Sequence, residues 1–320
     1  MKISKIILLW FLMISIIMAL SSSSFFFLWT CLEVNMMSFI PMMNLKTLSS
    51  TNSMMQYFVI QALASSLFIF FLINISINPK LMTNILSVAI ISSMLIKVGA
   101  VPFHVWFPQV SEGLSYYSFL ILSTVQKMIP LQIISMFTNN LILLSSILSA
   151  VVGSYGGLSQ FSTRKILAFS SITHLAWMLS LTYLKSNLWI HYLLIYFVIM
   201  VFITKLLNFY NFNNFNQISL LPKEVSIHSF ILFLSLGGMP PMVGFFMKWL
   251  TLKILLLNIQ ILSIPLILSS LVNLFFYTRL MYPIFLKNFT NFKWTTSSSN
   301  SLTSFLLTQL ALIFMLIPSI

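Results

Sequence analysis

The stretch Leu95-Ile-Lys-Val-Gly-Ala-Val-Pro-Phe-His-Val-Trp106 joins an apolar run to a break in that run. Gly99 and Pro102 interrupt what would otherwise be a helix, and Lys97 lies two residues before Gly99. A helix can be interrupted at membrane depth only where its freed backbone is buried in protein or lines a water-filled cavity. The stretch therefore predicts a broken membrane helix inside a bundle of helices.

A second stretch of the same kind lies in the other half of the chain. It reads Leu236-Gly-Gly-Met-Pro-Pro-Met-Val-Gly-Phe-Phe-Met-Lys248, and its interruptions are at Gly237, Gly238, Pro240 and Pro241. Interrupted helices at matching positions of two halves are typical of transporters built from inverted repeats. The alternative is that Gly and Pro are simply frequent in membrane helices.

The composition excludes several classes of protein. Of the 320 residues 59% are hydrophobic and 6% are charged, which is too apolar for a soluble globule or a disordered chain. The net charge of +13 comes from basic residues scattered singly, which argues against nucleic-acid binding. The single cysteine, Cys31, excludes an internal disulfide and a cysteine-based metal site.

The apolar runs predict an all-α polytopic membrane protein. A spanning helix needs about 20 mostly apolar residues, and the runs do not alternate in polarity as the strands of a membrane β-barrel would. Eleven transmembrane helices are expected, at 6–20, 25–44, 54–77, 82–107, 114–137, 139–159, 163–184, 188–208, 226–257, 261–284 and 302–319.

The interruptions fall in the fourth and ninth of these spans. Dividing the first ten spans into two sets of five places each interruption on the fourth helix of its set, and an odd number of helices inverts the second set. The predicted organisation is a first five-helix repeat over 1–137, an inverted repeat over 138–284, and a loop with a C-terminal helix over 285–320.

Lysine and arginine in the loops predict the orientation of the chain. The side of the membrane that holds the N-terminus receives eight of them and the opposite side two, Lys80 and Lys185. The N-terminus is therefore expected in the inner compartment, and an odd number of spans places the C-terminus outside. The eight are Lys2, Lys5, Lys46, Arg164, Lys165, Lys223, Lys287 and Lys293.

Four charged residues lie near span centres, where each is a functional hypothesis because charge at that depth is costly. They are Glu33, Lys97, Lys127 and Lys248. Desolvation favours the neutral form of a buried lysine, whereas a nearby carboxylate favours its charged form. Such a lysine can gain or lose a proton when its neighbour changes charge, so a row of lysines with one glutamate can relay protons. The alternative is an ion pair that only fixes helix packing.

The remaining candidates are weaker. His104 follows the first interruption and could shuttle protons. His174, His191 and His228 are interpreted as packing residues, because a single histidine inside a membrane is more often a hydrogen-bonded packing residue. Four scattered histidines also do not provide the facing pairs that haem needs. Near the span ends, Lys205, Lys253 and Arg279 are expected to extend toward the membrane surface, and Gly153 with Gly157 forms a G-x-x-x-G pattern for close helix packing.

Five stretches resemble the NADH dehydrogenase subunit 2 family, the antiporter-like membrane subunits of mitochondrial respiratory complex I, in its metazoan form. The match in order and spacing covers about residues 1–285, and the stretches are 29–41, 97–108, 126–130, 164–177 and 237–249.

The resemblance implies roles for the buried charges. Glu33 matches the glutamate of that family's proton channel, Lys97 and Lys127 its two central lysines, and Lys248 the lysine of the second half-channel. His104 matches a histidine beside the first broken helix. The resemblance also implies that this form would lack three N-terminal helices that other antiporter-like subunits have. It leaves open how the lipid-facing flank of the bundle is sealed.

The implied function is proton translocation across the mitochondrial inner membrane, driven by electron transfer from NADH to ubiquinone in other subunits. This chain would bind no cofactor, since NADH, FMN, iron–sulfur clusters and ubiquinone would be held elsewhere. Its partners would be other membrane-arm subunits and inner-membrane lipids. The N-terminus would face the matrix and the C-terminus the intermembrane space. Two alternatives are a stand-alone cation/proton antiporter and a structural scaffold that does not pump.

Overall fold

The computed structural model describes residues 2–45, 47–77, 84–212, 217, 223–240 and 242–290. These ranges are helical with short connections. The α-helices are α1 (Lys2–Ser21), α2 (Phe25–Met43), α3 (Leu48–Ile77), α4 (Asn84–Val98), α5 (Trp106–Glu112), α6 (Tyr116–Ser123), α7 (Met128–Ser135), α8 (Asn140–Leu158), α9 (Thr163–Tyr183), α10 (Leu188–Phe209), α11 (Lys223–Gly237), α12 (Val243–Asn258) and α13 (Ser263–Thr290), and the 3₁₀ turns are η2 (Val125–Lys127) and η4 (Gln260–Leu262).

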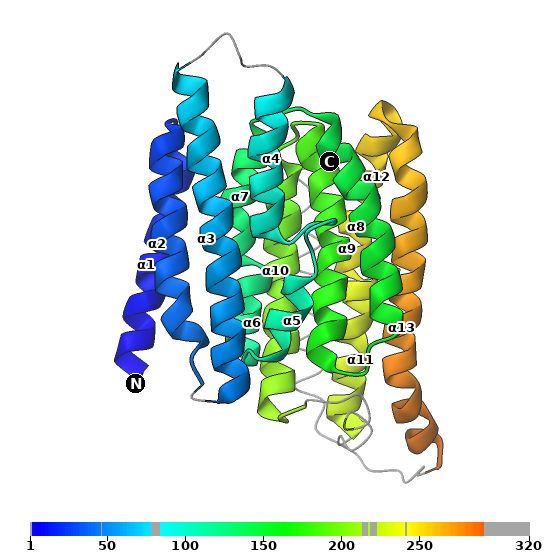
Figure 1. Cartoon of the computed structure of the whole chain (residues 1–320). Helices are drawn as coiled ribbons and strands as arrows, with labels where there is room; N and C mark the ends of the chain where they lie inside the picture. Colours follow the sequence, from blue (N-terminus) through cyan, green and yellow to red (C-terminus); the bar gives the residue numbers. More distant parts are fainter. Residues whose placement is uncertain are drawn as a thin grey trace.

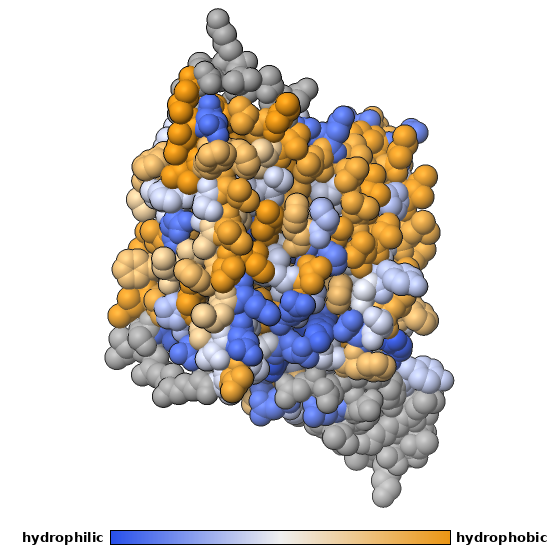
Figure 2. All heavy atoms as spheres, viewed as in Figure 1, coloured by the Kyte–Doolittle hydropathy of each residue, from blue (hydrophilic) through white to orange (hydrophobic). Residues whose placement is uncertain are grey.

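The helices stand side by side in one bundle, with the start of α1 at its lower end (Figure 1). Within the described residues, seven are long and apolar enough to cross a membrane, and three shorter helices are also apolar. Figure 2 shows hydrophobic side chains over much of the flank and hydrophilic ones gathered mainly toward the lower end. The predicted all-α polytopic membrane class is confirmed. The count of eleven stays a prediction, because span 302–319 lies outside the described residues.

Helix α9 forms the centre of the bundle, and most of its side chains are buried. Helix α8 approaches it closely because α8 carries glycines on the facing side. A Cβ added to Gly153 would come within 2.7 Å of the Thr173 side chain, and one added to Gly157 would come within 3.1 Å of Phe276 on α13. The G-x-x-x-G pattern therefore does bring helices into close contact, as small residues do in membrane bundles.

Both helices that the sequence predicts to be broken are interrupted in the structure. Helix α4 ends at Val98, and α11 ends at Gly237. Each end is closed by a glycine in the left-handed region, Gly99 with φ +76° and Gly238 with φ +83°. The amide after each glycine donates to a carbonyl five residues earlier, which is the Schellman pattern of helix ends.

The two interrupted helices run in opposite directions. In Figure 1, α4 descends from the upper end to α5 lower in the bundle, whereas α11 lies low and α12 lies near the upper end. Pro240 follows the second interruption directly. Pro241, also predicted as part of it, lies outside the described residues.

The predicted span over 114–137 corresponds to one candidate membrane span, Tyr116–Ser135, but this span is not a single regular helix. The structure divides this span into α6 and α7, joined by the 3₁₀ turn η2. Pro130 explains the interruption, because its ring lacks an N–H and would clash with the carbonyl of Gln126, four residues earlier. Thr124 adds to it by donating its hydroxyl to the Leu120 carbonyl at 2.7 Å. Lys127 consequently lies at an irregular turn and not in the middle of a regular helix.

Candidate site: a row of buried lysines

The last turn of α4 holds Lys97, whose side chain is 6% exposed. Glu33 on α2 is half-buried and lies close enough to interact electrostatically with the Lys97 ammonium. No direct salt bridge joins these two groups, both of which belong to the described part of the chain. The carboxylate and the ammonium thus attract one another without being locked in contact.

The carbonyls left free at the end of α4 are satisfied by side chains from other elements. Gln61 on α3 donates its amide to the Lys97 carbonyl at 3.2 Å, and the Trp106 indole N–H donates to the Ile96 carbonyl at 3.1 Å. A helix end inside a membrane needs such partners, since water cannot be assumed there. The packing around the first interruption therefore stabilises the break.

Lys127, in the turn η2, is 2% exposed. Its ammonium donates to the Ser171 carbonyl on α9 at 3.1 Å. The same nitrogen lies over the ring of Phe107, 4.9 Å from the ring centre, which is a cation–π contact. Phe107 belongs to α5, the segment that follows the first interruption, so Lys127 connects that segment to the central helix.

Lys248 on α12 is 5% exposed and reaches back across the second interruption. Its ammonium donates to the Gly237 carbonyl at 2.7 Å and approaches the Leu236 carbonyl at 3.5 Å. These carbonyls form the negative end of the α11 dipole, where a cation is favourable. If Lys248 lost a proton, its hydrogen bond to the Gly237 carbonyl would weaken. The charge of Lys248 is therefore coupled to the geometry of the second interruption.

His174 on α9 lies near two of these lysines, although the sequence interpretation treats it as a packing residue. Its ring is near enough to interact electrostatically with both Lys127 and Lys248. Nδ1 lies 2.8 Å from the Tyr192 hydroxyl, and Nε2 is buried without a hydrogen-bond partner in the described structure. A signal was present in the sequence: Ser171 and His174 are three residues apart and share a helix face.

The other candidates lie away from this row. His104 is partly exposed, and its Nδ1 lies 3.3 Å from the Pro102 carbonyl. Within the described residues no hydrogen bond or ion pair joins His104 to the buried lysines. Lys205 and Lys253 are exposed on the flank. Arg279 donates to the Leu158 carbonyl at 2.7 Å and so caps the end of α8.

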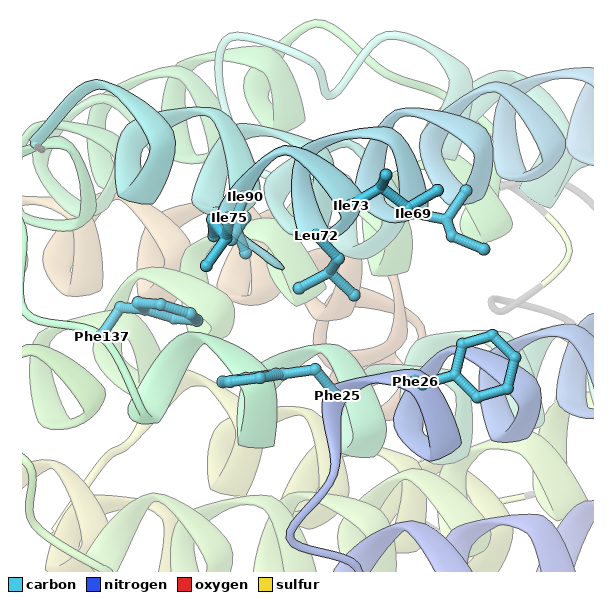
Figure 3. A pocket seen from close by; sticks show the side chains of 8 residues that line it. All are labelled: Phe25, Phe26, Ile69, Leu72, Ile73, Ile75, Ile90 and Phe137. Carbon is cyan, nitrogen blue, oxygen red and sulfur yellow. The ribbon is translucent and has the colours of Figure 1, made fainter. Parts of the chain in front are cut away.

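The structure also contains an apolar hollow of about 340 Å³. Figure 3 shows that α2, α3 and α4 supply most of its lining, with Phe137 closing one side. Among the described residues, aromatic and aliphatic side chains line it. The lining residues are Phe25, Phe26, Ile69, Leu72, Ile73, Ile75, Ile90 and Phe137. Within the described residues, no three His, Cys, Asp or Glu side chains gather as a metal site would require.

The two glycines of the second interruption provide a matched stability test. We expect Gly238→Ala to destabilise the protein by about 1–2 kcal/mol, because its left-handed φ is unfavourable for alanine. The new methyl group would also meet Lys248 Cδ at 2.9 Å. Gly237→Ala should be nearly neutral, since its nearest neighbours would lie at 3.6 Å. Heat-induced unfolding of the membrane-extracted chain measures both variants. Equal melting temperatures for the two would contradict this account.

Comparisons with known proteins identify the family. The family model described as NADH:quinone oxidoreductase/Mrp antiporter, TM matches residues 22–274. The NADH-ubiquinone oxidoreductase chain 2 of Anopheles gambiae is 40% identical over 304 residues, which cover 92% of this chain and 89% of that protein. The protein of the same name from Rhipicephalus sanguineus is 39% identical over 315 residues, covering 97% of both chains.

Solved structures show the same fold. A chain of respiratory complex I from Thermus thermophilus superposes with a TM-score of 0.74 at 20% identity, covering 88% of this chain and 70% of that one. A chain of the Mrp complex from a Dietzia species gives a TM-score of 0.75 at 17% identity, covering 87% and 59%. The fold is therefore that of the antiporter-like membrane subunits, and by its similarity to the Anopheles gambiae and Rhipicephalus sanguineus proteins this chain belongs to the NADH-ubiquinone oxidoreductase chain 2 family.

Proposed function

We propose that this chain translocates protons as a membrane-arm subunit of mitochondrial NADH:ubiquinone oxidoreductase. NADH oxidation and ubiquinone reduction take place in other subunits, and this chain holds no redox centre. The observation that carries the proposal is the row of three buried lysines, each beside an interruption in a membrane helix. Buried lysines at that depth are costly to retain unless the charge is used.

The relay runs from Glu33 and Lys97 through Lys127 to Lys248, with His174 near the last two. Two unit charges about 10 Å apart at an effective dielectric constant of about 20 interact by about 1.7 kcal/mol. This changes the proton affinity of a neighbouring group by more than about tenfold. A change in the Glu33–Lys97 interaction is therefore strong enough to drive a proton from one lysine toward the next.

The two interruptions also support two inverted five-helix repeats over 1–137 and 138–284, followed by 285–320. Both breaks have the same Schellman closure, and the interrupted helices run in opposite directions. In each repeat a lysine then lies beside the broken fourth helix, Lys97 before one break and Lys248 after the other. Each repeat accordingly supplies one half of the proton route.

The chain lies in the inner membrane with its N-terminus toward the matrix and its C-terminus toward the intermembrane space. The bias of loop lysines supports this orientation. Other membrane-arm subunits cover part of the exposed apolar flank. Lipid acyl chains fill the apolar hollow beside Phe25 and Phe137, since an apolar cavity of this kind excludes water.

The decisive measurement compares the intact complex with the isolated chain, each in sealed liposomes. The intact complex should acidify or alkalinise the lumen when NADH is oxidised, and the isolated chain should move no protons in response to a cation gradient. Cation-driven transport by the purified chain would favour a stand-alone antiporter and would contradict the proposal.

Replacing Glu33 by glutamine tests the first step of the relay. The substitution keeps the shape of the side chain but removes the charge that attracts Lys97. We expect proton pumping per NADH-oxidising complex to fall severalfold, because a loss of about 1 kcal/mol in that attraction corresponds to about fivefold in proton affinity. Pumping into liposomes, normalised to assembled complex, measures the effect.

Glu112→Gln is the matched control for this substitution. Glu112 is the last residue of α5 and pairs at 2.7 Å with Lys165 in a partly exposed salt bridge. Such pairs contribute about 0–1 kcal/mol, so pumping should stay near that of the unaltered complex. If Glu33→Gln and Glu112→Gln behave alike, Glu33 is not part of the relay.

A further inference from the structure

Two aromatic side chains join the first interruption to the turn that holds Lys127. Trp106 and Phe107 begin α5, the helix that follows the interruption, and both are buried. Both also pack onto the interruption itself, since a Cβ added to Gly99 would lie 3.3 Å from Trp106 Cζ2 and 3.2 Å from Phe107 Cβ. The two rings meet edge to face, with their centres 5.6 Å apart. In so closely packed a place, Phe107 cannot shift unless the chain around Gly99 shifts with it.

The ring of Phe107 also faces the lysine relay. The Lys127 ammonium lies over this ring, 4.9 Å from its centre. The face of an aromatic ring attracts a cation, and more strongly where water is excluded, whereas a neutral amine lacks this attraction. Because both side chains are buried, the strength of the contact depends on whether Lys127 carries its proton.

A second contact keeps the turn η2 close to the interruption. Tyr57 on α3 is buried and packs against Trp106, with ring centres 6.1 Å apart. Its hydroxyl donates to the side-chain carbonyl of Gln126 at 3.2 Å, and Gln126 immediately precedes Lys127. This contact joins neutral groups, so it stays the same when Lys127 changes its charge. The contact with Phe107 is the one that responds to that charge.

We infer that Phe107 is a positioning residue that couples the shape of the first interruption to the charge of Lys127. While Lys127 is protonated, its ammonium holds the ring of Phe107 and with it the start of α5. Once the proton has passed on, this attraction is lost. Coupling of this kind is reciprocal, so a displacement of the interruption moves the ring and changes the balance between charged and neutral Lys127. The inference rests on the proposed function, because the coupling matters only if Lys127 carries protons.

Removing the ring tests this coupling in the intact complex. We expect Phe107→Leu to lower NADH-driven pumping per assembled complex by about fivefold, because losing a desolvated cation–π contact changes the balance between charged and neutral Lys127 by about that factor. Phe107→Tyr keeps the ring face and should pump at close to the unaltered rate. If Phe107→Leu does not assemble, Phe107→Met is measured in its place, since methionine also fills an apolar site without a ring.

Phe68→Leu is the matched control. Phe68 on α3 is fully buried, so this substitution removes the same atoms from the core of the bundle. In the described part of the chain, cations lie over the rings of Phe107 and Tyr116 and not over that of Phe68. Pumping per assembled complex should therefore stay near that of the unaltered complex.

Combining Phe107→Leu with Lys127→Met shows whether the ring acts through the lysine. In the Lys127→Met chain, Phe107→Leu should cause no further loss of pumping, because no ammonium is left for the ring to hold. A further fivefold loss there overturns the inference. So does a Phe107→Leu complex that pumps like the Phe68→Leu control, or a Phe107→Tyr complex that pumps as slowly as Phe107→Leu. The proposed function fails on a different result, which is normal pumping by Lys127→Met alone.

Discussion

Replacing Lys127 by methionine should leave the complex assembled and abolish most of its proton pumping. We expect a loss of at least about tenfold, equivalent to about 1.4 kcal/mol on the limiting barrier. Methionine has a similar length and suits an apolar site, and removing a buried charge seldom destabilises a core when the space stays filled. NADH oxidation should fall together with pumping, because electron transfer is coupled to proton movement.

The environment of Lys127 makes this the most sensitive position. It contacts the central helix through the Ser171 carbonyl and the first interruption through Phe107, so a relay between the two halves depends on it. Lys205→Met is the matched control, because Lys205 is exposed on α10. A Lys127→Met complex that assembles and pumps with unchanged stoichiometry would instead support the structural scaffold.

The second large effect is expected for Lys248→Met. This substitution removes the group that exchanges protons in the second half and also removes the cap on the Gly237 carbonyl. Pumping should fall at least about tenfold, as for Lys127→Met. The amount of assembled complex should also decline, since loss of a cation at a helix C-terminus costs about 0.3–1 kcal/mol at exposed sites and up to about 2 kcal/mol at partly buried ones.

Lys253→Met controls for the loss of a lysine from the same helix. Lys253 lies five residues after Lys248 but is exposed on the flank, so neither assembly nor pumping should change. Measuring pumping per assembled complex separates the two effects of Lys248→Met. If pumping per assembled complex is normal and only the yield falls, Lys248 is a structural cap and not a relay residue.

Local sequence signals predicted where two membrane helices are interrupted. Glycine and proline at 99, 102, 238 and 240 determine where helices end, because their effects act on the backbone within one turn. The 3₁₀ turn that ends at Lys127 was not predicted, although Pro130 disfavours a regular helix there. Its signal was masked by the uniform hydropathy of 114–137, which favours a single span.

The sequence by itself determined the membrane class, most of the helices, both principal interruptions and the short set of buried charges. These depend on hydropathy and backbone preference, which are read within a few consecutive residues. Only the tertiary structure decided what each charge contacts. Lys127 donates to the carbonyl of Ser171, 44 residues away, and His174 is near enough to interact electrostatically with both Lys127 and Lys248. Such contacts depend on how α9 packs among its neighbours, and no local pattern encodes that packing.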